Sequence, residues 1–115
     1  MTKDRRVVVT GIGAVTSIGG NVAEFWKSLL EGECGIGPVS LFDASSYRTQ
    51  TAAEVRRIPD GFLTAAQKRR MSRADRMGLA AAAEAVAQSG LDLSREDLTR
   101  VGVILGGGTS GLLDS

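Results

Sequence analysis

The sequence has 115 residues, of which 43% are hydrophobic and 23% charged, a composition typical of a globular protein. Fourteen basic and thirteen acidic residues leave a net charge of +1, which provides no overall field for nucleic acid or an anionic membrane. One cysteine excludes an internal disulfide and fits a reducing, cytoplasmic compartment, and the lack of histidine excludes a Ser-His-Asp or Cys-His pair and the usual zinc ligands.

The N-terminal third predicts a strand, a glycine loop and a helix. Arg6–Thr10 is a short β-branched run typical of a buried strand, and it is far too short for the apolar region of a signal peptide. Glycines punctuate residues 11–20, after which Asn21 and Glu24 form a capping-box pattern and Gly32 ends the helix. The spacing of the apolar residues within this helix predicts one apolar stripe, formed by Val22, Phe25, Trp26, Leu29 and Leu30.

The middle of the chain is rich in loops. Residues 51–55 are a weak candidate for a short strand, and Thr64 with Gln67 predicts a capped helical turn. This turn leads into Lys68-Arg69-Arg70, the most concentrated basic run of the chain. Such a run is more often a solvated helix face than a docking surface for an anionic partner, and the residues by themselves favour the solvated face.

The last third predicts a helix and a strand. Residues 75–88 are rich in alanine, Ser89-Gly90 closes this helix, and residues 101–105 are apolar at nearly every position. The alternation of strands and helices predicts an α/β fold with a mainly parallel sheet. A strand of that kind needs cover on both faces, and too little chain follows it, so we expect the opening segment of a larger α/β enzyme.

Two motifs that suggest chemistry have simpler explanations. Gly11 and Gly13 match the first two glycines of a dinucleotide-binding loop, but Thr16 occupies the third position and the helix begins too late to face a phosphate. A structural turn therefore fits this loop better. Cys34 follows a helix C-terminus and lies beside Glu33, and both features disfavour a reactive thiolate.

Taken together, the chain resembles the N-terminus of the β-ketoacyl-acyl carrier protein synthases, most closely the elongating type II bacterial enzymes and related polyketide ketosynthases. The resemblance is collinear over essentially all 115 residues. The segments that carry it are RRVVVTGIGAVTSIG (5–19), FWKSLLEG (25–32), GI (35–36), FDAS (42–45), RRM (69–71), SGL (89–91) and GGGTSGL (106–112).

This resemblance implies a thiolase-like fold with αβαβα layers in the full-length protein, usually a homodimer, of which residues 1–115 are an incomplete part of the N-terminal domain. It also implies decarboxylative condensation of acyl thioesters with malonyl-acyl carrier protein, without a metal or another cofactor. The family's catalytic cysteine and two histidines match positions beyond Ser115, and Cys34 does not align with the nucleophile. No catalytic residue is therefore expected here, and we expect the segment alone to be inactive and poorly folded.

The resemblance also implies two sites. Arg69 and Arg70 match basic positions that dock the acidic carrier protein in the family. This match reverses the interpretation of the basic run as a solvated face. Ala66 stands where the family commonly has lysine, and Lys68 is expected to compensate partly for it. Gly108 and Thr109 belong to the glycine-rich turn that lines the acyl pocket. Thr109 replaces the usual isoleucine, and we expect a shifted acyl-chain preference, toward polyketide-like or unsaturated chains.

Two alternatives remain open from the sequence. One is a non-catalytic subunit that resembles a chain-length factor, keeping the fold without the nucleophile. The other is a Rossmann-like nucleotide-binding module, which the glycine spacing and the late helix disfavour.

Overall fold

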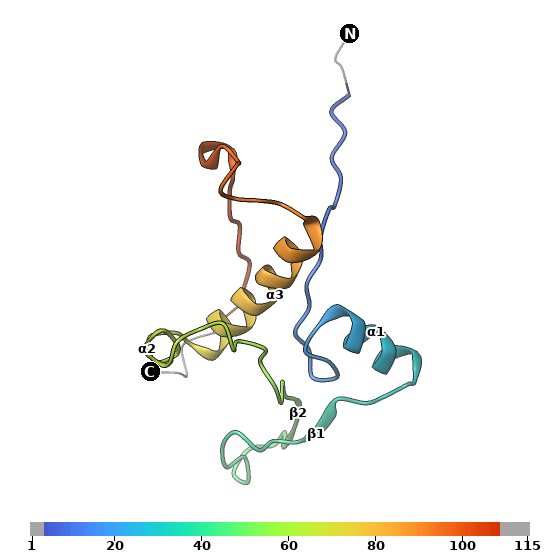
Figure 1. Ribbon diagram of the computed structural model, residues 1–115. Coiled ribbons are helices and arrows are strands. Elements are labelled where there is room, and N and C mark those ends of the chain that lie inside the picture. Colours follow the sequence, from blue (N-terminus) through green and yellow to red (C-terminus); the bar gives the residue numbers. More distant parts are fainter. Residues whose placement is uncertain (1–3, 109–115) are drawn as a thin grey trace.

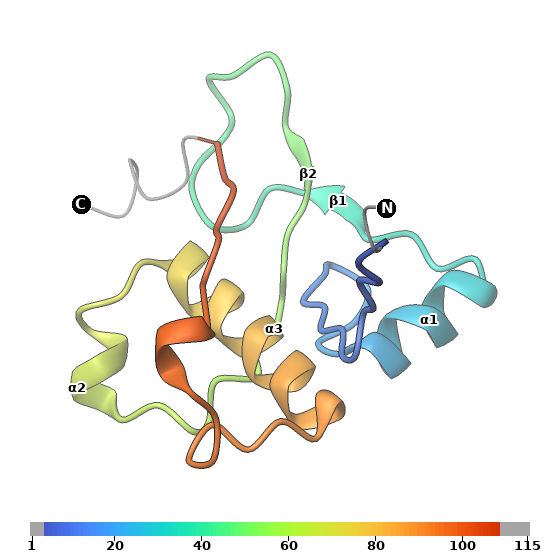
Figure 2. The same ribbon diagram turned by 90° about the horizontal axis from the view of Figure 1, so that it is seen from above.

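The computed structural model describes residues 4–108. Its longest helix, α3, lies between α1 on one side and α2 on the other, and a small two-stranded arm extends away from the helices (Figures 1 and 2). The elements in chain order are α1 (Val22–Leu30), β1 (Ile36–Pro38), β2 (Thr51–Ala53), α2 (Ala65–Lys68), α3 (Arg73–Ser89) and the 3₁₀ turn η1 (Leu98–Arg100).

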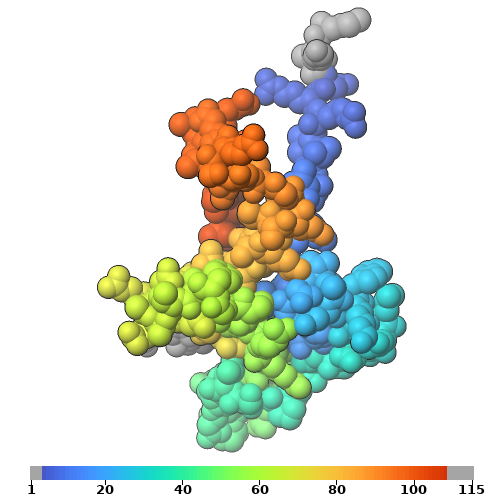
Figure 3. Space-filling view, in the orientation of Figure 1, coloured from blue at the N-terminus to red at the C-terminus, as the bar shows by residue number. Residues whose placement is uncertain are grey.

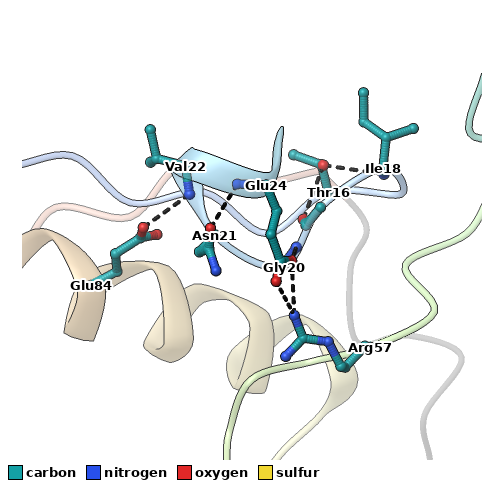
Figure 4. Close-up of polar contacts among 9 residues, drawn as sticks. Thr16, Ile18, Gly20, Asn21, Val22, Glu24, Arg57 and Glu84 are labelled. Carbon is teal, nitrogen blue, oxygen red and sulfur yellow. Dashed lines mark hydrogen bonds and ion pairs between the residues drawn. The ribbon is translucent and has the colours of Figure 1, made fainter. Parts of the chain in front are cut away.

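Helix α1 begins where the sequence predicts, but its cap differs in one respect. The Asn21 side chain accepts a hydrogen bond from the Glu24 backbone N–H at 2.8 Å. The Glu24 carboxylate does not complete a capping box with Asn21. Instead it accepts from the backbone N–H of Gly20 at 2.8 Å and forms an ion pair with Arg57 at 2.8 Å (Figure 4). Gly32 follows the helix with φ of 72°, the left-handed conformation that favours glycine.

Capping boxes start both α2 and α3. The predicted box of Thr64 and Gln67 is confirmed, with backbone-to-side-chain distances of 3.2 Å and 2.8 Å. A second box, formed by Ser72 and Asp75, starts α3 slightly earlier than the alanine pattern suggests. The predicted end is confirmed, because Gly90 has φ of 69° directly after the last helical residue.

The sheet of the described residues is antiparallel, so the prediction of a mainly parallel sheet is wrong for this part of the chain. β1 pairs with β2 in the register Ile36↔Ala53 and Pro38↔Thr51. The candidate strand at 51–55 is confirmed over its first three residues. β1 was not predicted, since its sequence Ile-Gly-Pro contains two residues that are rare in strands.

The predicted strands at 6–10 and 101–105 are not strands in the structure. Both segments run extended on opposite sides of α3 (Figures 1 and 2). Apart from the Val101 N–H, which donates to Leu98 at the end of η1, neither segment has a backbone hydrogen-bonding partner among residues 4–108. A strand is held by such hydrogen bonds to its neighbour, so β propensity alone does not form one. Their apolar side chains are exposed, with 92% of Val7 and 97% of Ile104 accessible.

Little of the chain is buried. Among the described residues only Gly20, Ala44, Asp60 and Ala80 are buried. The accessible surface is 9714 Å², whereas a folded monomer of this mass exposes about 6,000 Å². Within the described part of the chain, no helix is long and apolar enough to cross a membrane.

Candidate functional site

The predicted docking residues Lys68, Arg69 and Arg70 are brought together by one helical turn. Lys68 is the last residue of α2 and Arg69 is its C-cap. The turn continues past the helix, because the N–H of Arg69 donates to Ala65 at 3.2 Å and that of Arg70 donates to Gln67 at 3.0 Å. The segment around α2, yellow-green in Figure 3, projects from one side of the molecule. We call these three residues the basic turn.

The members of the basic turn differ in their partners. Lys68 is half-buried, and its Nζ lies 2.9 Å from Oδ1 of Asp60. Arg69 and Arg70 are exposed, and neither side chain forms an ion pair or hydrogen bond with another residue in the range 4–108. The two arginines are therefore available to an external anion, whereas Lys68 is engaged within the chain.

Asp60 is the buried anion of this region, with 7% of its side chain exposed. Its second oxygen accepts from Nε of Arg76 at 2.6 Å. Hydrogen bonding to Lys68 and then to Arg76 holds the pKa of Asp60 below its ordinary value, against the opposing effect of desolvation. The sequence carries a signal that we did not use: Asp60 is the only acidic residue in the range 55–74, which contains six basic residues.

The segment that carries Asp60 is fastened to α3 at two points. Arg73 donates a hydrogen bond to the backbone carbonyl of Val55, and Arg76 pairs with Asp60. These arginines are three positions apart, so they project from one face of the helix. Residues 55–60, α2 and the first turns of α3 therefore form one connected unit.

The glycine loop packs against α3 on another face of that helix. A Cβ atom on Gly11 would lie 2.0 Å from the carbonyl oxygen of Ala85, and one on Gly13 would lie 1.9 Å from that of Ala81. Only glycine permits so close an approach of two backbones. This contact agrees with the structural interpretation of the loop.

The amides of the loop are already occupied by α3 side chains. The N–H of Ile12 donates to Gln88 at 2.6 Å, and that of Ala14 donates to Glu84 at 3.0 Å. Glu84 also accepts from the N–H of Val22 at 2.9 Å at the start of α1 (Figure 4). A phosphate-binding loop presents free amides to an anion, whereas here the Ile12 amide is bound to the Gln88 carboxamide and the Ala14 amide to the Glu84 carboxylate, which would repel phosphate. Nucleotide binding is therefore disfavoured here.

The predicted acyl-pocket residues lie at the edge of what the structure describes. Gly106 and Gly107 line an apolar groove of about 560 Å³ beside α3, together with Met71, Ala74, Asp75, Gly78, Leu79, Ala82, Val103 and Leu105. Gly108 is exposed and does not line this groove, and Thr109 lies outside the described residues. Their role in acyl binding remains a prediction.

Cys34 is an exposed free thiol in the loop after α1. It lines a small cavity of about 210 Å³ with residues 16–20, Glu24, Glu33, Gly35, Arg56 and Arg57. The acidic and basic groups of this cavity are mixed, and nothing in it singles out the thiol as a nucleophile. No cluster of three or more metal-ligating side chains occurs within residues 4–108.

These observations define a chain of helices with a small antiparallel sheet that contains no histidine for a histidine-dependent catalytic pair and presents an exposed basic turn. The chain belongs to the β-ketoacyl synthase family, because residues 4–114 match the family described as "Beta-ketoacyl synthase, N-terminal domain". The resemblance inferred from the sequence is thereby confirmed.

Relatives come from two groups of synthases. The chain is 39% identical over 109 residues to 3-oxoacyl-[acyl-carrier-protein] synthase 2 of Coxiella burnetii, a match covering 94% of this chain and 26% of that protein. It is 45% identical over 112 residues to putative polyketide beta-ketoacyl synthase 1 of Streptomyces halstedii, with the same two coverages. It is 40% identical over 104 residues to granaticin polyketide putative beta-ketoacyl synthase 1 of Streptomyces violaceoruber, covering 89% of this chain and 24% of that protein. The chain thus spans about a quarter of the length of these relatives.

Proposed function

We propose that residues 1–115 are the first part of the N-terminal domain of a 3-oxoacyl-[acyl-carrier-protein] synthase. Such an acyltransferase condenses acyl thioesters with malonyl-acyl carrier protein in fatty-acid or polyketide synthesis. The observation that carries this proposal is the match of residues 4–114 to the family, with relatives named as a 3-oxoacyl-[acyl-carrier-protein] synthase and as a putative polyketide beta-ketoacyl synthase.

The proposed fold of the complete protein is the layered αβαβα arrangement of a thiolase-like homodimer. The exposed apolar segments 7–9 and 103–105 support this proposal. Segments that are apolar at successive positions suit strands covered on both faces, as in a sheet between helix layers. The catalytic cysteine and two histidines are proposed to lie outside this chain, which contains no histidine.

The contribution of this chain to the activity is proposed to be partner recognition. Arg69 and Arg70 are exposed and unpaired among the described residues, so they suit the acidic surface of a carrier protein. Charge complementarity of this kind accelerates encounter and selects the partner. Lys68 is proposed to contribute less, because its charge is already balanced by Asp60. Gly108 and Thr109 are proposed to line the acyl pocket.

The experiment is a double charge reversal, Arg69→Glu with Arg70→Glu, in the complete synthase. We expect KM for the acyl-carrier protein to rise by about tenfold or more, because two attractions become repulsions. The kinetics with carrier-free acyl and malonyl thioesters should be unchanged, since neither substrate then uses the surface. High salt should reduce the difference between the variant and the parent enzyme.

The matched control is Arg48→Glu with Arg95→Glu, which changes the net charge equally at two exposed arginines outside the basic turn. If the control raises KM for the carrier as much as the test variant does, total charge rather than this surface recognises the carrier. That result would overturn the assignment of the docking site.

A further inference from the structure

We propose that Asp60 is a positioning residue for carrier docking: its buried carboxylate fastens α2 to α3 and thereby aims Arg69 and Arg70 at the partner. This inference rests on the proposed function and adds to it a residue that does not itself contact the carrier.

The first step is the geometry of the link. One carboxylate oxygen of Asp60 binds Lys68 at 2.9 Å, and the other binds Arg76 at 2.6 Å. Lys68 belongs to α2 and Arg76 to α3, so a single buried group joins the two helices. Lys68 and Arg76 are also partly buried, with 34% and 30% of their side chains exposed, so solvent screens these contacts less than it screens an ordinary surface pair.

The second step is that α2 needs an external tether. It is a single turn of four residues, and a helix of that length is not stable by itself in water. The backbone carbonyl of Asp60 also accepts from the N–H of Leu63 at 2.9 Å, in the turn that leads to the Thr64 cap. Asp60 therefore acts on α2 at both ends, through its backbone before the helix and through its side chain at Lys68.

The third step connects α2 to the two arginines. Backbone hydrogen bonds tie Arg69 to Ala65 and Arg70 to Gln67, so both residues move with the turn. Only Met71 separates them from Ser72, the cap of α3. If the link through Asp60 is lost, α2 is free to change its angle to α3, and Arg69 and Arg70 move with it away from the arrangement seen here.

A positioning role and a simple charge effect predict opposite changes in KM for the carrier when Asp60 is replaced. Replacement of Asp60 by asparagine removes a negative charge from a basic region, and by electrostatic steering alone this would strengthen binding of an acidic carrier. A positioning role predicts weaker binding in spite of the added positive charge. The direction of the change in KM therefore separates the two explanations.

The experiment compares Asp60→Asn in the complete synthase with the same substitution in an Arg69→Gln/Arg70→Gln background. We expect Asp60→Asn to raise KM for acyl-carrier protein by about fivefold and to leave the kinetics with carrier-free acyl and malonyl thioesters within about twofold. In the Arg69→Gln/Arg70→Gln background, Asp60→Asn should produce no further rise, because residues that act through one another are not additive.

A fall or no change in KM for the carrier would overturn the inference, as would an equal rise in both backgrounds. If Asp60→Asn does not fold, Arg76→Gln tests the other half of the link. Positioning predicts that its effect also disappears without Arg69 and Arg70, whereas an effect of charge alone persists.

The experiment distinguishes failure of the role of Asp60 from failure of the docking surface. If Arg69→Gln/Arg70→Gln raises KM and Asp60→Asn does not, only the role of Asp60 falls, but if the double variant leaves KM unchanged, the docking surface itself is wrong.

Discussion

Substitution of Gly13 by alanine tests the contact between the glycine loop and α3. The added Cβ would lie 1.9 Å from the carbonyl oxygen of Ala81, whereas Cβ atoms essentially never lie closer than 3.0 Å to a neighbouring heavy atom. The loop must therefore retreat by about 1 Å or more, because neither side of the contact is a flexible side chain. That movement breaks the hydrogen bonds of Ile12 to Gln88 and of Ala14 to Glu84. Because one neutral and one charge-assisted hydrogen bond are lost, we expect the free energy of local opening of this loop to fall by about 2–4 kcal/mol.

Amide hydrogen exchange in the complete synthase measures this cost directly. A loss of about 2–4 kcal/mol corresponds to a fall of about 30- to 1,000-fold in the protection of the Ile12 and Ala14 amides. The control is Gly37→Ala, where an added Cβ meets no atom within 4 Å and the two amides should exchange as in the parent protein. If the Gly13→Ala and Gly37→Ala variants protect these amides equally, the close packing of loop on helix is refuted.

Two further predictions concern acid stability and the isolated chain. The Gly20 N–H, and after it the charge of Arg57, lowers the pKa of Glu24 from its ordinary 4.5. The ionised Glu24 carboxylate therefore stabilises the folded state fully when the pH is above the ordinary pKa of 4.5. This stabilisation is lost as the pH falls through the lower pKa that Glu24 has in the folded state. At pH 7 the complete synthase should have a higher thermal midpoint than its Glu24→Gln variant. The difference in midpoint should disappear in acid, and a difference that stays constant with pH would contradict this prediction. Residues 1–115 alone should show no cooperative heat-absorption peak, because the chain leaves 9714 Å² accessible. A monomeric peak near the roughly 80 kcal/mol expected for a folded domain of this length would refute that expectation.

The features that the sequence predicted well are those set by neighbouring residues. The caps of α1 and α2 and the end of α3 depend on side chains within about one helical turn of the backbone groups that they satisfy. Where other donors competed for the capping carboxylate, the prediction failed in detail. Glu24 turned to Gly20 and Arg57 because a cation from outside the helix was close enough to pair with it. That cation is 33 residues away in the sequence, so no capping rule could include it.

The features that failed depend on partners distant in sequence. Val7 and Ile104 have strand propensity, but pairing needs a neighbouring backbone that the described residues do not provide. The contact of Gly13 with Ala81 was missed for a related reason. Alanines on several faces of a helix indicate close packing without identifying which segment approaches. Asp60 gave a usable but unused signal, as a single acid within a basic stretch.

The proposed docking surface is more self-contained than the fold around it. Every contact that shapes the basic turn comes from residues 55–76, whereas the extended segments at 7–9 and 103–105 find no strand partner. Contacts between residues close in sequence form at a small cost in chain entropy, so this unit can organise before the sheet is assembled. In the complete synthase, a substitution in this unit should therefore affect carrier recognition more than the condensation chemistry. This expectation follows from Asp60 linking α2 to α3. It is why KM for the carrier, compared with the kinetics of carrier-free acyl and malonyl thioesters, is the informative measurement.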